Sequence, residues 1–181
     1  MNLNTMTKNM NVIITSNKID LKLIHDLVED LKKRSDIFAL ILHDKDLKDT
    51  GERKTRHLHI VYQLSNRTRL STELRYLSNT FSININAISI EKMNNFVGSL
   101  QYLIHKNDPS KYQYRYSDIY TNIEPKELNL YLEMEIKCFS WEYLKEVLQE
   151  CENVVEVIDK IGLNYYRLYR GVIADIKRWG C

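Results

Sequence analysis

The sequence predicts an α+β protein: an antiparallel sheet with helices on one face, followed by a small all-α C-terminal region. Three observations predict this architecture. Up to about residue 122, segments with apolar residues at every second position alternate with segments whose apolar residues recur every three to four positions. Beyond Pro125 only the helical period continues. The Asn-Ile-Glu-Pro sequence at residues 122–125 is typical of a boundary between the two parts.

The first elements of the N-terminal part are three expected strands and a helix, and the second and third strands form a hairpin. Residues 10–16 form a short β-rich run, and residues 20–34 carry the apolar stripe of an amphipathic helix. Residues 37–43 are almost continuously apolar, which is typical of a central strand. After a charged loop, residues 56–64 alternate between two faces, as a strand requires. The loop, residues 44–56, contains Gly51, which permits a turn.

The next elements complete the order β-α-β-β-α-β-α. Residues 69–80 predict a helix, residues 83–90 a strand and residues 94–106 a helix. Residues 112–116 alternate and would add an edge strand. The order is close to the split βαβ, or ferredoxin-like, plan, and the open sheet face is expected to carry the site.

Residues 1–122 are therefore expected to form one domain and residues 123–181 a helical region. Helices are predicted at 128–135, 141–151, 154–161 and 165–179. Residues 161–170 suggest a turn followed by a basic helix, as in a DNA-contacting module. The alternative is a small bundle that packs on the first domain or mediates self-association.

Composition limits the class of protein. With 181 residues, of which 44% are hydrophobic, the chain can bury a core without disulfides. Its three cysteines, Cys138, Cys151 and Cys181, form no C-x-x-C pair, so we expect a reducing, cytoplasmic location. The longest apolar stretch, residues 37–42, is far shorter than the about 20 residues of a membrane span, which argues against a membrane role.

Charge is uneven along the chain. Residues 1–122 contain 18 Lys and Arg against 13 Asp and Glu, a net charge of +5, whereas the remainder has a net charge of −3. A basic N-terminal part is a weak indication of a polyanionic partner.

Histidines cluster where the predicted hairpin closes. His57 and His59 stand two positions apart on a strand, so both imidazoles project from one face. His43 ends the preceding strand, and Asp46 follows three positions later. If the strands pair, these four side chains converge into a site suited to Mn²⁺, Zn²⁺ or a similar ion. The alternatives are unrelated surface histidines and, for Asp46, an ordinary charged loop.

Tyr102 is a candidate nucleophile on the helix predicted at 94–106. Helical spacing places it on one face with Ser99, His105 and Lys106. A tyrosine hydroxyl is mostly protonated at neutral pH, so it needs a cation such as Lys106, protonated His105 or a metal ion. With twelve tyrosines in the chain, a packing role is the alternative.

Three blocks taken together resemble the rolling-circle plasmid replication initiators of the HUH endonuclease superfamily. They are ILHDKD at 41–46, RHLHIVY at 56–62 and QYLIHKNDPSKYQY at 101–114, and the resemblance spans residues 37–116. By this resemblance His57 and His59 match the two histidines of the HUH motif, His43 and Asp46 match further metal ligands, and Tyr102 matches the nicking tyrosine. The implied cofactor is Mn²⁺ or Mg²⁺.

The resemblance implies an enzyme that nicks one strand of a plasmid origin. The tyrosine becomes joined to the 5′ phosphate, host polymerase extends the 3′-hydroxyl, and the enzyme later rejoins strands. Termination would use a second subunit or a water activated by Asp44 or Glu91, and self-association is expected. Relaxases and single-strand transposases of the superfamily are alternatives, as is a non-catalytic nucleic-acid-binding module. The chain lacks an RNP-like octamer and the paired H-x-[ST] motifs of two-histidine RNA ligases.

Basic residues flank the predicted metal site and are candidate phosphate contacts: Lys45, Arg53, Lys54 and Arg56. Lys111 and Arg115, in the tyrosine-rich run that follows, are further candidates to hold phosphates of a single strand. The tyrosines at 112, 114, 116 and 120 either stack bases or pack as an edge strand.

Overall fold

The computed structural model describes residues 2–134, 147–151, 153 and 155–157. The chain divides into two compact units, Met1–Met134 and Glu135–Cys181. In the second unit, residues 147–150 and 155–157 are helical and Cys151 is a buried free thiol. The helix predicted at 165–179 and the basic segment at 161–170 lie outside the described residues.

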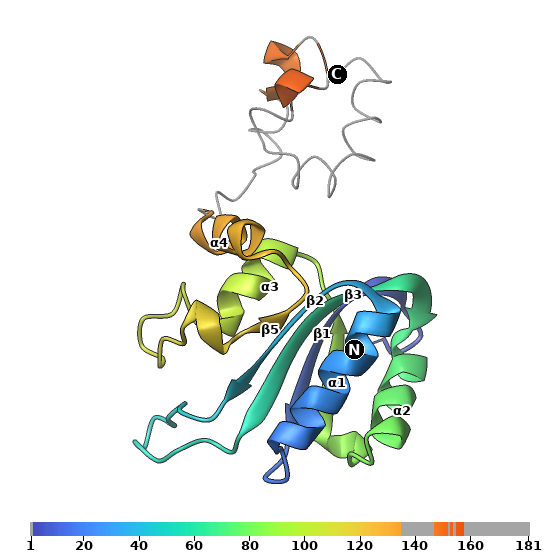
Figure 1. The fold of residues 1–181 in the computed structure, drawn as a ribbon, viewed down its shortest axis with the longest axis vertical. Coiled ribbons are helices and arrows are strands. Elements are labelled where there is room, and N and C mark those ends of the chain that lie inside the picture. Colours follow the sequence, from blue (N-terminus) through green and yellow to red (C-terminus); the bar gives the residue numbers. More distant parts are fainter. Residues whose placement is uncertain (1, 135–146, 152, 154, 158–181) are drawn as a thin grey trace. The chain divides into compact units, whose positions relative to one another are not determined.

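A five-stranded antiparallel sheet forms the first unit, which confirms the α+β class (Figure 1). The strand order is β4-β1-β3-β2-β5. The strands are β1 (Met6–Thr15), β2 (Ser35–His43), β3 (His57–Arg69), β4 (Ile88–Lys92) and β5 (Tyr120–Thr121).

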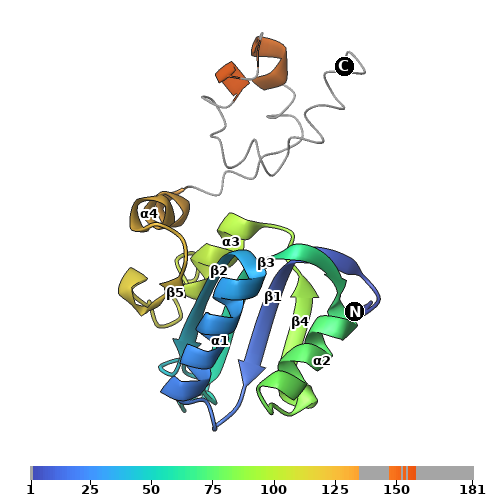
Figure 2. The same ribbon diagram turned by 45° about the vertical axis from the view of Figure 1, so that its right-hand side comes forward.

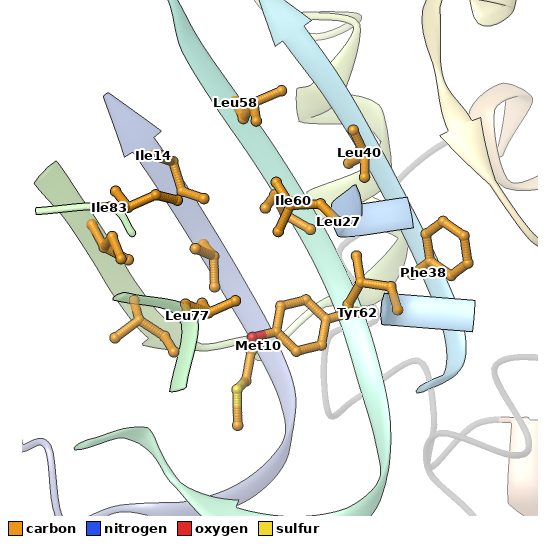
Figure 3. Packing of buried hydrophobic residues seen from close by; sticks show 14 of the residues in the cluster. Met10, Ile14, Leu27, Phe38, Leu40, Leu58, Ile60, Tyr62, Leu77 and Ile83 are labelled. Atoms are coloured by element: carbon orange, nitrogen blue, oxygen red, sulfur yellow. The ribbon is translucent and has the colours of Figure 1, made fainter. Parts of the chain in front are cut away.

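Two helices cover one face of the sheet, as expected. They are α1 (Leu21–Arg34) and α2 (Leu70–Thr80), which lie side by side across the strands in Figure 2. Asp20 caps α1 by accepting a hydrogen bond from the Leu23 amide at 2.8 Å. Beneath them Met10, Ile60 and Tyr62 are buried in the larger hydrophobic cluster, shown in Figure 3. This cluster holds the sheet and the two helices together.

The opposite face is covered only in part, an arrangement the sequence did not predict. Helices α3 (Phe96–Leu103) and α4 (Pro125–Glu133) pack over β2 and β3 there. Buried residues of this second cluster include Ala39, Ile41, Val61, Leu100 and Leu132. Because α4 contributes to it, the first unit extends past residue 122, where we expected the domain boundary.

Three expected elements differ in the structure. Strand β4 begins at Ile88 because residues Ile85–Ala87 form a 3-10 turn, capped by the Asn84 side chain. Residues 112–116 form no strand; the edge strand is β5, whose Thr121 hydroxyl donates to the Phe38 carbonyl. The helix predicted at 94–106 ends at Leu103.

A buried charged network ties α1, α2 and β3 together. Arg34 donates to both carboxylate oxygens of Glu73, at 3.2 and 3.0 Å, and to Asp30 at 2.7 Å. The Tyr62 hydroxyl donates to Glu73 at 2.9 Å. No helix among the described residues is long and apolar enough to cross a membrane.

Candidate functional site

The β2–β3 hairpin brings three histidines onto one face of the sheet. In its register His43 pairs with His57 and Ile41 pairs with His59. The ring centres of His43 and His59 lie 4.4 Å apart, and those of His57 and His59 lie 5.0 Å apart. One nitrogen from each ring falls within 4.8 Å of the others. The expected convergence of these histidines is therefore present.

Asp46 joins them from the loop between the strands. The loop folds back on itself. The Lys54 amide donates to the Asp46 carbonyl at 2.8 Å, and the backbones of Leu47 and Arg53 form an isolated antiparallel β-bridge. The Asp46 carboxylate is only 5% exposed. Its Oδ2 lies 3.5 Å from His43 Nδ1 and 3.6 Å from His57 Nε2.

His105 completes the cluster as a candidate ligand, a role the sequence did not predict for it. After α3 the amides of His105 and Lys106 donate back to the carbonyls of Tyr102 and Gln101, each at 3.1 Å, which is a Schellman ending. His105 occupies the left-handed position with φ of 57°. This reversal buries its ring 4.4 Å from that of His43, with Nδ1 3.7 Å from Asp46 Oδ1.

Outer hydrogen bonds orient three of the imidazoles. Nδ1 of His57 donates to the Thr55 carbonyl at 2.8 Å, Nε2 of His43 to the Leu103 carbonyl at 2.7 Å, and Nδ1 of His105 to the Tyr112 carbonyl at 2.9 Å. Each donation fixes the tautomer and leaves the other ring nitrogen with a lone pair. Metal-binding histidines are oriented in the same way.

The donor set fits a divalent cation. His43 Nδ1 is buried and has no hydrogen-bond partner among the described residues. Burial lowers the pKa of His43 to about 4 and, together with the neighbouring imidazoles, the pKa of His59 to about 2. Both rings are therefore neutral at pH 7, as metal ligation requires.

Tyr102 lies at the edge of this cluster, in the last turn of α3. Its side chain is 46% exposed, and its ring centre is 5.5 Å from those of His59 and His105. Lys111 donates to its hydroxyl at 3.2 Å. Lys106, which we expected to assist, instead donates to the Leu132 carbonyl and pairs with Glu133, because the helix ends before it.

Tyr114 packs against the cluster and contacts both His43 and Asp46. Its ring stacks on His43 at 4.5 Å, and its hydroxyl lies 3.4 Å from Asp46 Oδ1. Burial raises the pKa of Tyr114, so the hydroxyl stays protonated and donates to the carboxylate. The Lys45 amide donates to the same hydroxyl at 2.9 Å. Tyr114 therefore positions Asp46.

The predicted phosphate contacts lie around the cluster at the surface. Lys45 donates to the Tyr112 hydroxyl at 3.1 Å. Arg53, Lys54 and Arg56 are exposed in the hairpin loop, and Arg115 is exposed beside a 3-10 turn at Tyr116–Asp118.

The chain matches the family model of the plasmid replication protein origin-binding domain over residues 8–126. This is more than half of the chain. The chain belongs to this family.

The origin-binding domain match spans every residue of the cluster and Tyr102. Replication protein RepB of Lactiplantibacillus plantarum is 31% identical over 93 residues, which cover 51% of this chain and 40% of that protein. A replication protein of Onion yellows phytoplasma (strain OY-M) is 30% identical over 125 residues, which cover 63% of this chain and 30% of that protein. The chain thus matches less than half the length of each relative.

Proposed function

We propose that this chain binds plasmid origin DNA and nicks one strand, with Tyr102 as the nucleophile and a divalent ion, Mn²⁺ or Mg²⁺, held by the histidine cluster. The observation that carries the proposal is the position of an exposed tyrosine beside a buried cluster of imidazoles and a carboxylate. Membership of the origin-binding domain family supplies the DNA partner. The resemblance of three sequence blocks to HUH endonucleases supports the nicking step.

The residues that would hold the ion are His43, His57 and His59, with Asp46 and His105 adjoining them through His43. When bound, a divalent ion polarises a phosphate and offsets the charge that develops on its oxygens during transfer. Tyr114 and the backbone carbonyls of Thr55, Leu103 and Tyr112 keep the ligands oriented before DNA arrives.

Tyr102 attacks the phosphorus of the scissile phosphodiester. A bond forms between the Tyr102 oxygen and phosphorus, and the bond from phosphorus to the 3′ oxygen breaks. The phenol proton passes to solvent, and the departing 3′ oxygen takes a proton to become a hydroxyl. The Lys111 ammonium, 3.2 Å from the phenol oxygen, stabilises the phenolate as it forms.

The product is a 5′-phosphotyrosine and a free 3′-hydroxyl. The covalent bond conserves the energy of the phosphodiester, so the reverse attack rejoins a strand. In the cytoplasm the hydroxyl serves host polymerase as a primer. We include self-association in the proposal, because a second subunit is one route to termination.

Basic side chains around the cluster hold the DNA backbone. Arg53, Lys54 and Arg56 extend from the hairpin loop on one side of the histidines, and Lys45 lies beside them. Lys111 and Arg115 contribute from the segment after α3. Their contacts are to phosphates and therefore add affinity rather than sequence preference.

A covalent trap tests the nicking step. The full chain is incubated with a randomised single-stranded DNA pool and Mn²⁺, denatured, and assayed for DNA that remains attached. We expect an adduct with the wild type and with Tyr120→Phe, a control at an exposed tyrosine on β5, and none with Tyr102→Phe. An adduct that persists in Tyr102→Phe contradicts the assignment of the nucleophile. If no protein forms an adduct, including the wild type, the nicking step is rejected and only DNA binding is left.

A second experiment tests the metal site without DNA. Mn²⁺ should raise the thermal midpoint of the wild type, because an ion that binds only the folded state stabilises it. His57→Ala and His59→Ala should lose the shift and abolish nicking, whereas His25→Ala, on the exposed face of α1, should keep both. An unchanged shift in both cluster variants would place the ion elsewhere.

A further inference from the structure

A pocket of about 510 Å³ opens on the sheet beside Tyr102. Its floor comes from β1, β3 and β4, and its wall comes from α3. His59 and Tyr102 line the end nearest the histidine cluster. The volume is within the range of sites that hold small organic ligands.

The strand register explains why this pocket adjoins the cluster. Across the sheet, Ser89 pairs with Ile13 and Ile13 pairs with His59. All three side chains therefore face the same side, on which the cluster lies. The pocket floor continues directly from a metal-site histidine.

In the next row the positions on β4 and β1 are polar, where a sheet facing a helix would ordinarily be apolar, and only the position on β3 is apolar. Glu91 pairs with Asn11, and Asn11 pairs with Val61. Helix α3 contacts β2 and β3, and the face of β1 and β4 next to it lines the pocket. Asn11 and Glu91 are therefore available to a ligand rather than to the core.

The two polar side chains of this row, Asn11 and Glu91, are arranged to accept hydrogen bonds. Asn11 Nδ2 donates to Glu91 Oε1 at 3.2 Å, which turns the amide so that Oδ1 faces away from the carboxylate. Asn11 Oδ1 is buried and has no hydrogen-bond partner among the described residues. Asn11 lines the pocket, so a rotation of its side chain would present Oδ1 to an N–H group there, which would supply the missing donor.

We propose that this pocket binds one base of the single DNA strand beside the scissile phosphate, and that Asn11 and Glu91 select a base with an exocyclic amino group. Adenine, cytosine and guanine carry such a group, whereas thymine offers a carbonyl in its place. Carboxylate and amide oxygens can each accept one N–H of the amino group, whereas thymine offers a single N3–H donor and sets its carbonyl oxygen against the second acceptor.

The inference rests on the proposed function only in placing the scissile phosphate at Tyr102. It gives Glu91 a role in recognition rather than in activating water during termination. Binding without cleavage tests it, so its result is independent of whether nicking occurs.

The test titrates the full chain, in EDTA to prevent cleavage, with fluorescein-labelled oligo-dA, oligo-dC and oligo-dT. Homopolymers about ten nucleotides long fill the pocket with a known base in every register. The wild type should bind oligo-dA and oligo-dC about fivefold or more tighter than oligo-dT, the effect of about one hydrogen bond. Fluorescence anisotropy measures all three affinities.

Substitutions in the pocket test whether Asn11 and Glu91 cause the preference for bases with an amino group. Asn11→Leu and Glu91→Gln should bring the oligo-dA and oligo-dC affinities to that of oligo-dT. Ser89→Trp, at an exposed floor position, should weaken all three by filling the pocket. Asn79→Leu, an exposed amide on α2 at the opposite face of the sheet, should change none.

Equal affinities for the three oligonucleotides in the wild type overturn the proposal, as does a preference that survives in both Asn11→Leu and Glu91→Gln. Failure to bind any oligonucleotide also overturns it. A preference found here without a covalent adduct in the trapping assay would instead keep the pocket and reject the nicking chemistry.

Discussion

The ammonium of Lys111 lies 3.2 Å from the hydroxyl oxygen of Tyr102 and 4.9 Å from the centre of its ring. Asp108, 3.0 Å away, holds Lys111 in place. The hydrogen bonds to Asp108 and Tyr102 raise the pKa of Lys111, so it stays charged at physiological pH. Lys111, nine positions after the tyrosine, therefore occupies the place beside the hydroxyl that we expected Lys106 to occupy.

Lys111→Met should therefore slow adduct formation at neutral pH. Loss of one charge-assisted hydrogen bond predicts a rate about tenfold or more lower. Raising the pH should narrow the difference, since hydroxide then removes the phenol proton without help. Single-turnover rates across pH measure this, with Lys106→Met as the matched control. If Lys111→Met and Lys106→Met slow adduct formation equally at every pH, the two lysines act only through the net positive charge of the site and not through a contact with the Tyr102 hydroxyl.

Glycine at position 105 should be better tolerated by the backbone than alanine. The φ of 57° at His105 is strained for any residue with a Cβ, by about 1 kcal/mol. Both His105→Gly and His105→Ala remove the imidazole, so their difference isolates the backbone. Urea unfolding in EDTA should find His105→Gly the more stable by about that amount. A less stable glycine variant would argue against a left-handed residue at this position.

The metal-free protein should lose stability as pH falls below about 6.5. Histidines in the unfolded chain take up protons near that value, whereas the folded pKa is about 4 for His43 and about 2 for His59. The unfolded state then binds more protons, so the contribution of these groups is complete above pH 6.5 and disappears progressively as pH falls toward 4 and below. Thermal midpoints in EDTA across this range test the direction.

Two variants separate this effect from other titrations. His43→Asn should reduce the pH dependence between 6.5 and 4, the interval bounded below by the folded pKa of about 4 and above by the unfolded value of about 6.5, and the remainder should come from His59. His25→Gln, at an exposed position of α1, should leave the dependence as in the wild type. A wild-type midpoint that is constant through the interval would exclude buried neutral imidazoles.

Glu73→Ala should be strongly destabilising although Glu73 is far from the site. The carboxylate is 3% exposed and accepts from Arg34 and from Tyr62. Its removal leaves a partly buried guanidinium without its main partner, which costs about 3 kcal/mol. Urea denaturation measures the loss. Glu29→Ala, which breaks an exposed pair with Lys32, should change little by comparison.

Much of this arrangement follows from periodicity in the sequence. The alternation over residues 56–64 predicted which side chains of β3 face the core, and the two-residue spacing of His57 and His59 predicted their common face. Hairpin pairing with the preceding strand then placed His43 beside them. Local patterns sufficed because all these ligands lie on adjacent strands.

The parts that the sequence did not predict depend on chain reversals. Helical periodicity runs on through His105 and Lys106, so it gave no sign that α3 ends at Leu103. A histidine in the left-handed position carries no signal comparable to a glycine there. The roles of Lys111 and Tyr114 follow from the same reversal, which returns residues 105–114 to the cluster.

His43 pairs with His57 across the hairpin, so both side chains face the same side of the sheet only while the register of the strands is kept. A single residue inserted within β2, ahead of His43, would turn His43 to the other side of the sheet, among the core residues and away from His57 and His59. The loop at residues 44–56 carries no such constraint beyond Asp46, since its length does not set which way the strand residues point. Related chains can therefore differ in the basic loop, which in the proposed function adds affinity for DNA, while they keep the histidine cluster unchanged, so that DNA affinity and the proposed chemistry would evolve on separate segments of one hairpin.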